Sequence, residues 1–173
     1  IELIPMEDGE AVFRSMAEEM VAEIEKNNAE GKNTVFICPV GPVGQYKYFV
    51  ETVNLKSINL KNTWFINMDE YLTEEKEWID KDDPLSFRGF MKNEVYDKID
   101  IDLVMPESNR VFPDPKNIKY IPELIKELGG VDICFGGIGI NGHVAFNEPE
   151  EKLNEEEFKK LQTRILEIKP ETR

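Results

Sequence analysis

The chain has 173 residues, enough for one domain with a substantial buried core. Hydrophobic residues make up 40% of it and charged residues 32%, a balance typical of a globular protein and not of a disordered one. The net charge of −14 at pH 7 disfavours nucleic acid and anionic membranes as partners, and no apolar run approaches the roughly 18 residues of a membrane span.

The first half of the chain alternates helical and extended patterns. Residues 9–28 place apolar side chains at helical spacing, which predicts an amphipathic helix. Residues 34–40 form a short apolar run typical of a strand buried on both faces, and residues 45–54 again have a helical pattern. A second strand, ending in acids, is predicted over residues 62–72.

The second half continues the alternation. Helices are predicted over residues 84–99 and 117–130, the latter beginning or bending at a proline and ending at two glycines. A third buried strand is predicted over residues 131–140, a surface helix over 153–162, and a further strand over 163–169.

Strands that alternate with helices predict an α/β fold with a largely parallel, open sheet. We expect one domain over residues 1–173, because no linker or repeat divides the chain. Cys38 and Cys134 lie in apolar runs and are expected to be buried free thiols in a reducing compartment. With no export signal at the start, this predicts a cytoplasmic protein.

Three loops are expected to share one edge of this sheet. In open α/β sheets ligands bind beyond the carboxyl ends of the strands, and residues 39–44, 67–71 and 136–149 each follow a predicted strand. The topology therefore predicts that these three loops form a single candidate site.

The first loop, "PVGPVG", permits two interpretations. Glycine lets backbone N–H groups approach an anion near a helix start, which favours a phosphate site at Gly41, Pro42 and Val43. However, proline lacks an N–H and valine lacks a hydroxyl, so a plain connector is an equal alternative.

The second loop places Asp69 beside Glu70 at the end of a strand. Adjacent residues on an extended chain point to opposite faces, so one of the two faces the cleft more easily. A carboxylate there can act as a general base once burial raises its pKa, or it can simply cap a helix or loop.

The third loop, "GGIGINGHVAFNEP", contains the only histidine of the chain, His143. Glu148 follows five residues later and is expected to orient the ring, while Asn141 can hydrogen-bond without supplying charge. The alternative is a tight turn in which the glycines, Gly137 and Gly142 among them, serve only backbone geometry.

Four segments together resemble one family. "GIGINGHVAFNEP", "FINMDEYL", "DPLSFRGFM" and the early "LIP" are similar to segments of the glucosamine-6-phosphate deaminases, also called isomerases, in the superfamily that includes the 6-phosphogluconolactonases. The resemblance covers essentially the whole chain. It implies a Rossmann-like sandwich, with helices on both faces of the sheet.

The resemblance also implies roles for individual residues. Asp69 matches the base that moves a proton between C2 and C1 of an open-chain amino sugar, which yields fructose 6-phosphate and ammonia. His143 matches the residue that assists ring opening, with Glu148 orienting it. Glu70 and Asn141 match positions that line the site. Proton transfer on a bound sugar phosphate implies neither a metal nor another cofactor.

Departures from the family pattern leave alternatives open. Hydroxyl-bearing residues that bind the sugar phosphate in the family are replaced by Val40 and Val43, at a cost of about 1–3 kcal/mol per lost charge-assisted bond. The family's C-terminal portion, with its phosphate-binding arginine and lysine, is expected to be missing. A 6-phosphogluconolactonase, a related sugar-phosphate isomerase and a non-catalytic sugar-phosphate sensor are therefore rivals, and assembly into a homo-oligomer stays open.

Overall fold

A parallel sheet organises the computed structural model, which describes residues 2–150 and 152–170. Within these residues the strand order is β3-β2-β1-β4, and every neighbouring pair runs parallel. The strands are β1 (Thr34–Cys38), β2 (Thr63–Asn67), β3 (Arg110–Val111) and β4 (Ile133–Cys134). The helices are α1 (Gly9–Glu30), α2 (Gln45–Lys56), α3 (Phe87–Glu94), α4 (Tyr120–Glu127) and α5 (Glu155–Phe158), with 3-10 turns η1 (Tyr96–Lys98) and η2 (Glu107–Asn109).

Helices cover both faces of the sheet, as expected. On one face Phe36 of β1 packs in a large core with residues of α1, α2 and α3, and its ring lies 6.1 Å from that of Phe65 and 5.5 Å from that of Phe135. On the other face a smaller core joins Val35 to Leu124 of α4. The predicted α/β fold class is therefore confirmed.

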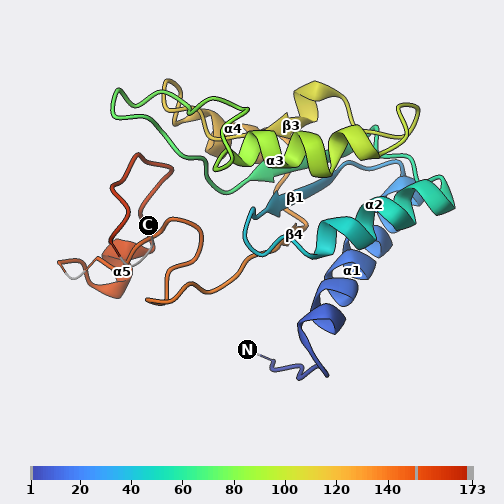
Figure 1. The fold of residues 1–173 in the computed structure, drawn as a ribbon, viewed down its shortest axis with the longest axis horizontal. Coiled ribbons are helices and arrows are strands. Elements are labelled where there is room, and N and C mark those ends of the chain that lie inside the picture. Colours follow the sequence, from blue (N-terminus) through green and yellow to red (C-terminus); the bar gives the residue numbers. More distant parts are fainter. Residues whose placement is uncertain (1, 151, 171–173) are drawn as a thin grey trace.

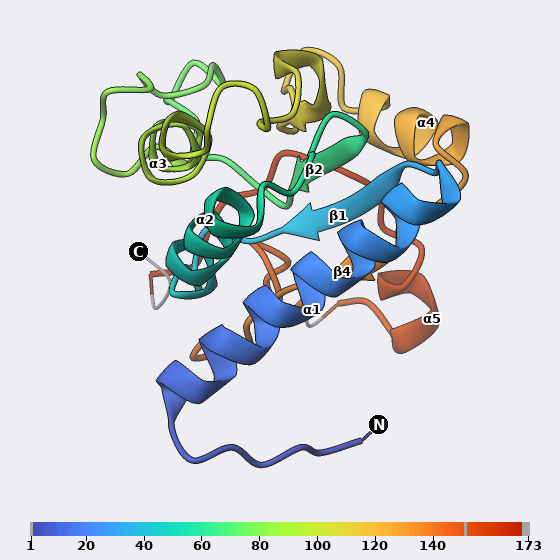
Figure 2. The same cartoon turned by 90° about the vertical axis from the view of Figure 1, so that its right-hand side faces the viewer.

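The N-terminal helix shows why the sequence pattern succeeds. Asp8 caps α1 by accepting a hydrogen bond from the backbone N–H of Ala11 at 2.8 Å, and Gly31 ends it in the left-handed region at a φ of 68°. Met20 and Ile24 of its inner face are buried. Figures 1 and 2 show α1 lying alongside α2.

Two strand predictions need correction. Residues 163–169 form no strand, because their backbone lies along the loop at residues 144–149, where the N–H of Lys169 hydrogen-bonds a side chain instead of a neighbouring strand. The strand predicted over 131–140 is reduced to β4, since the glycine-rich residues after it leave the sheet. The chain then runs to α5, toward the end of the long axis opposite α2 (Figure 1).

Helix ends and one cysteine also differ from expectation. The helix predicted over 84–99 begins only after Ser86, whose side chain caps α3, and its last part is the turn η1. The helices predicted over 117–130 and 153–162 shorten to α4 and α5. Cys134 is exposed and not buried, because β4 has a neighbour on one side only; Cys38 is buried as expected. No helix in the described ranges has the length and apolarity needed to cross a bilayer.

Candidate active site

The loops after β1, β2 and β4 meet at one edge of the sheet, as the topology predicts. A Cβ added to Gly136 would lie 3.1 Å from Cε of Met68, which follows β2. A Cβ added to Gly137 would lie 2.9 Å from Cδ of Pro42, which belongs to the loop after β1. A side chain at Gly137 would overlap the ring of Pro42, whereas one at Gly136 would only require the end of the Met68 side chain to shift.

Asp69 lies where the second and third loops touch. Its carboxylate accepts a hydrogen bond from the backbone N–H of Phe146. Burial raises the pKa of Asp69 to about 6; this hydrogen bond lowers the pKa, and the nearby negative charge of Glu70 raises it further. Asp69 is thus a carboxylate that can exchange a proton near neutral pH.

The third loop presents that N–H through an unusual backbone conformation. Ala145 has a φ of 54°, a left-handed value that residues with a side chain seldom adopt. The ring of Phe146, the next residue, lies 4.9 Å from that of Tyr71 and 5.8 Å from that of Phe87, and Tyr71 and Phe87 are 5.1 Å apart. These three rings, the aromatic cluster, tie the third loop to the second loop and to α3.

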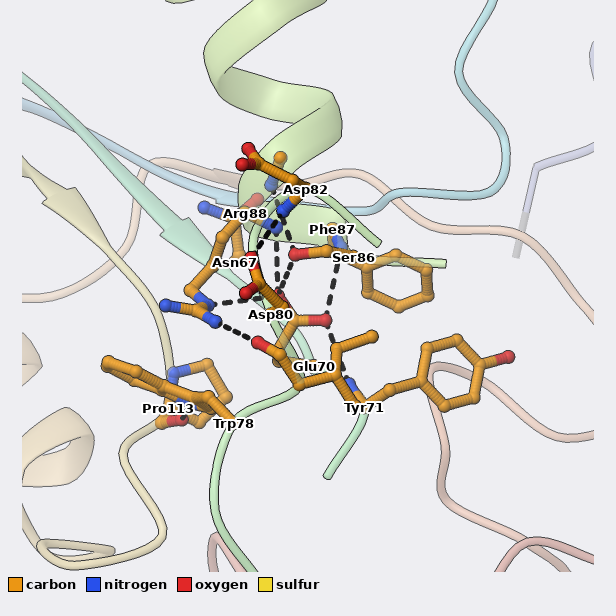
Figure 3. Close-up of polar contacts among 12 residues, drawn as sticks. Asn67, Glu70, Tyr71, Trp78, Asp80, Asp82, Ser86, Phe87, Arg88 and Pro113 are labelled. Atoms are coloured by element: carbon orange, nitrogen blue, oxygen red, sulfur yellow. Dashed lines mark hydrogen bonds and ion pairs between the residues drawn. The ribbon is translucent and has the colours of Figure 1, made fainter. Parts of the chain in front are cut away.

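The carboxylate of Glu70 points into the N-terminus of α3 (Figure 3). Its Oε1 accepts the backbone N–H groups of Tyr71 at 2.9 Å and Phe87 at 3.0 Å. Its Oε2 accepts the Ser86 hydroxyl at 3.2 Å and both the backbone N–H and the Nε–H of Arg88 at 2.8 and 3.3 Å. Both oxygens of Glu70 are thus occupied by donors of the protein itself, and a role of Glu70 in substrate binding stays a prediction.

His143, Asn141 and Glu148 form a hydrogen-bonded series. The Oδ1 of Asn141 accepts hydrogen bonds from His143, from the backbone N–H at 3.2 Å and from ring Nδ1 at 2.6 Å. The Nδ2 of Asn141 donates to Oε2 of Glu148 at 2.6 Å. Because an amide oxygen can only accept, the ring must carry its proton on Nδ1, which leaves the lone pair of the neutral ring on Nε2.

A glycine holds the histidine ring in place. A Cβ added to Gly139 would lie 2.0 Å from Nε2 of His143, so the ring rests directly on that backbone. The turn is closed by hydrogen bonds from the N–H of Gly139 to the carbonyl of His143 at 2.8 Å and from the N–H of Gly142 to the carbonyl of Gly139 at 2.9 Å. Gly142 has a φ of 86°, which explains why the turn uses glycine there.

The C-terminal segment contacts the third loop at three points that the sequence did not reveal. Lys169 donates its backbone N–H to Oε1 of Glu148 at 3.3 Å and its Nζ to the carbonyl of Pro149 at 2.9 Å. Arg164 donates from Nη1 to Oδ1 of Asn147 at 2.9 Å. No motif signals these contacts, since they join residues 17 to 21 positions apart through backbone groups and single side chains.

The first loop lies at the start of α2. Gly41 is exposed with a φ of 130°, Val43 is 37% exposed, and the carbonyl of Pro42 accepts from Nε2 of Gln45 at 3.0 Å. Gly44 precedes α2 and offers no side-chain cap, so the uncapped helix start is compatible with an anion. Phosphate binding by this loop stays a prediction.

Phe146 thus connects Asp69 to the loop that carries the series of His143, Asn141 and Glu148, and a shared catalytic role for these four residues stays a prediction. A hollow of about 460 Å³ lies between this loop and α5, lined by Gly142, Val144 and Phe158 among others, and includes neither Asp69 nor His143. The described part of the chain has no cluster of three His, Cys, Asp or Glu side chains arranged for a metal ion.

Among known proteins, no family model matches the chain. Individual curated proteins, however, match most of the chain. The glucosamine-6-phosphate deaminase of Bacteroides fragilis is 34% identical over 161 residues, which cover 88% of this chain and 56% of that protein. That of Caenorhabditis elegans is 32% identical over 160 residues, covering 88% and 57%. That of Mannheimia succiniciproducens is 30% identical over 176 residues, covering 98% and 61%.

Solved structures agree in fold. A monomeric glucosamine-6-phosphate deaminase of the NagB superfamily superposes with a TM-score of 0.81 at 22% identity, over 99% of this chain and 67% of its own. The 6-phosphogluconolactonase of Thermotoga maritima gives a TM-score of 0.60 at 21% identity, over 81% and 61%. The chain spans about three-fifths of the length of the curated relatives quoted above. In sequence the chain is similar to the curated glucosamine-6-phosphate deaminases, and in fold it is similar to a glucosamine-6-phosphate deaminase and to a 6-phosphogluconolactonase.

Proposed function

We propose that the protein is an amino-sugar phosphate deaminase that converts glucosamine 6-phosphate and water to fructose 6-phosphate and ammonia. One observation carries the proposal: a carboxylate with a raised pKa, Asp69, is hydrogen-bonded to the loop that holds a histidine in one tautomer. The curated relatives support the choice of substrate, because those named above are glucosamine-6-phosphate deaminases.

Asp69 is suited to move the carbon-bound proton. With a pKa of about 6 it is mostly ionised at neutral pH and more basic than an ordinary aspartate. In the proposed reaction it takes the proton from C2 of the open-chain sugar and returns it to C1. The C1 carbonyl oxygen gains a proton and the amine nitrogen loses one, so that the amine-bearing carbon becomes an imine. Water then adds to the imine carbon and ammonia leaves, with no net oxidation or reduction of the sugar.

His143 is suited to open the sugar ring. The hydrogen bond to Asn141 keeps the proton of the neutral ring on Nδ1, and Nε2 can then accept the proton of the C1 hydroxyl and deliver it to the ring oxygen. Glu148 holds the amide of Asn141 in the orientation that this requires. The neutral amide fixes the tautomer without adding a charge beside the ring.

The phosphate is the part of the substrate that this chain is least obviously equipped to hold. The net charge of −14 repels an anion, so binding requires a local donor set. We propose that the N–H groups at the start of α2, beside Gly41 and Val43, contribute to it. Without hydroxyl groups in that loop, affinity for the phosphate should be modest.

The test is ammonia release by the complete protein from glucosamine 6-phosphate, with glucosamine as the control for phosphate dependence. We expect turnover of the phosphorylated sugar and far slower turnover of the other. Hydrolysis of 6-phosphogluconolactone is measured in parallel, because the fold also matches a 6-phosphogluconolactonase. Lactone hydrolysis without ammonia release would refute the deaminase proposal in favour of a lactonase. Binding of the sugar phosphate without either reaction would refute it in favour of a non-catalytic sensor.

A further inference from the structure

Asp69 and Glu70 are consecutive acids with opposite surroundings. We propose that Glu70 is a positioning residue, whose carboxylate clamps the end of β2 to the start of α3 and thereby fixes Asp69 and the aromatic cluster beside it. The inference rests on the proposed function in one respect only, namely that Asp69 is the reacting base.

The clamp depends on a carboxylate specifically. The side chain of Glu70 is only 1% exposed, and its two oxygens together accept five N–H or O–H donors. An amide in its place would direct an NH₂ group at donors on one side or the other, and a shorter acid would not reach α3. Neither substitute would therefore accept all five of the donors that Glu70 accepts.

One oxygen of this carboxylate organises the surroundings of Asp69. Oε1 of Glu70 binds the backbone N–H groups of both Tyr71 and Phe87, and the rings of these two residues pack against Phe146. Phe146 in turn donates its N–H to Asp69. The clamp therefore holds two members of the aromatic cluster, and the third member contacts the catalytic carboxylate.

The other side of the clamp extends into the loop between β2 and α3. Arg88 lies with its guanidinium 4.5 Å from the ring centre of Trp78 and donates from Nη2 to the carbonyl of Ile79 at 2.5 Å. Trp78 donates from Nε1 to the carbonyl of Pro113 at 2.9 Å. Figure 3 shows these groups around Glu70, so one partly buried ion pair joins the segment after β2 to α3.

Charge and position must be separated experimentally, because the negative charge of Glu70 itself raises the pKa of Asp69. Tyr71 also interacts electrostatically with Asp69. Glu70→Gln removes both the charge and the second acceptor. Glu70→Asp keeps the charge and loses only the reach, so it isolates the positional effect.

The experiment compares these two variants of the complete protein with wild type and with Asp83→Asn as a matched control. Asp83 is an exposed acid in the same loop, whose carboxylate accepts only the N–H of Leu85 among the hydrogen bonds of the described residues. Two quantities are measured: the titration midpoint of the Asp69 carboxyl by carbon NMR, and kcat with KM for ammonia release.

We expect both Glu70 variants to lower the midpoint of Asp69 from about 6 toward the ordinary 3.8, because loosened rings admit water. We expect kcat to fall about 10²-fold with KM nearly unchanged. Asp83→Asn should match wild type in both. If Glu70→Asp retains the wild-type midpoint and kcat, or if only Glu70→Gln changes them, Glu70 acts through charge alone and the proposal fails.

A second variant covers the case in which neither Glu70 variant folds. Phe87→Leu keeps the backbone N–H bound to Glu70 and removes one ring of the aromatic cluster. The proposal predicts a lower midpoint for Asp69 in this variant, and an unchanged midpoint overturns it. The NMR titration needs no turnover, so a wild-type protein that releases no ammonia refutes the proposed function and leaves the clamp to be judged separately.

Discussion

Replacing Gly139 by alanine should disable the site without unfolding the protein. The new Cβ would lie 2.0 Å from Nε2 and 2.1 Å from Cε1 of His143, whereas an ordinary contact begins at 3.4 Å. The ring must therefore move by 3.4 − 2.0 = 1.4 Å, or the turn must open. A displacement of about 1 Å in a catalytic group can cost about 10²-fold in rate, and we expect a loss of at least that size.

The assay combines ammonia release with nitrogen NMR of the imidazole, which is straightforward because His143 is the only histidine of the chain. Ile138→Ala is the control, since this side chain is 82% exposed one position away and should leave both signals at wild-type values. Thermal unfolding should show a small change for both variants. Wild-type activity and an unmoved imidazole in Gly139→Ala would refute the geometric reasoning.

Three further predictions follow from the charges and hydrogen bonds of the site. Asp69→Asn should raise the free energy of unfolding at pH 8 by up to about 3 kcal/mol, because the pKa of the folded carboxyl, about 6, lies above its ordinary 3.8 and its ionisation therefore opposes folding. The gain should vanish below about pH 3, where the carboxyl is protonated in both the folded and the unfolded state, and urea unfolding at the two pH values measures the difference. Asn141→Leu should release the ring of His143 from its Nδ1–H tautomer, visible by nitrogen NMR, and lower kcat at least about tenfold through the lost hydrogen bonds; an unchanged tautomer contradicts the series described above. Val43→Ser supplies a hydroxyl at the exposed loop before α2 and should lower KM for the phosphorylated sugar about fivefold to tenfold, while turnover of unphosphorylated glucosamine stays the same.

Much of the fold follows from apolar patterning. The runs that contain β1 and β2 are continuous and β-branched, as a parallel sheet buried on both faces requires, and the two strands pair in register from Thr34 with Thr63. By contrast, β3 has only two residues, too few for any period to be visible. Residues 163–169 are rich in apolar side chains, which favours a strand, although Lys169 hydrogen-bonds a loop residue instead of a neighbouring strand.

The site was predictable in its location and less so in its contacts. Parallel topology alone brings the three loops to one edge, and the rule that adjacent side chains diverge predicts that one of Asp69 and Glu70 faces the cleft more easily than the other. Which acid faces it depends on donors from Ser86 to Arg88, far along the chain. The left-handed backbone at Ala145 likewise has no signal in the sequence, since alanine rarely adopts it.

The most direct test of the account uses glucosamine 6-phosphate deuterated at C2, with the wild-type protein, Asp69→Asn, and Asp83→Asn as the matched exposed control. If Asp69 carries the proton from C2, deuteration slows the wild-type protein and the control, and Asp69→Asn releases ammonia about 10²–10⁴-fold more slowly while still binding the sugar. Ammonia release by Asp69→Asn within a few-fold of the wild-type rate would contradict the assignment of Asp69 as the base.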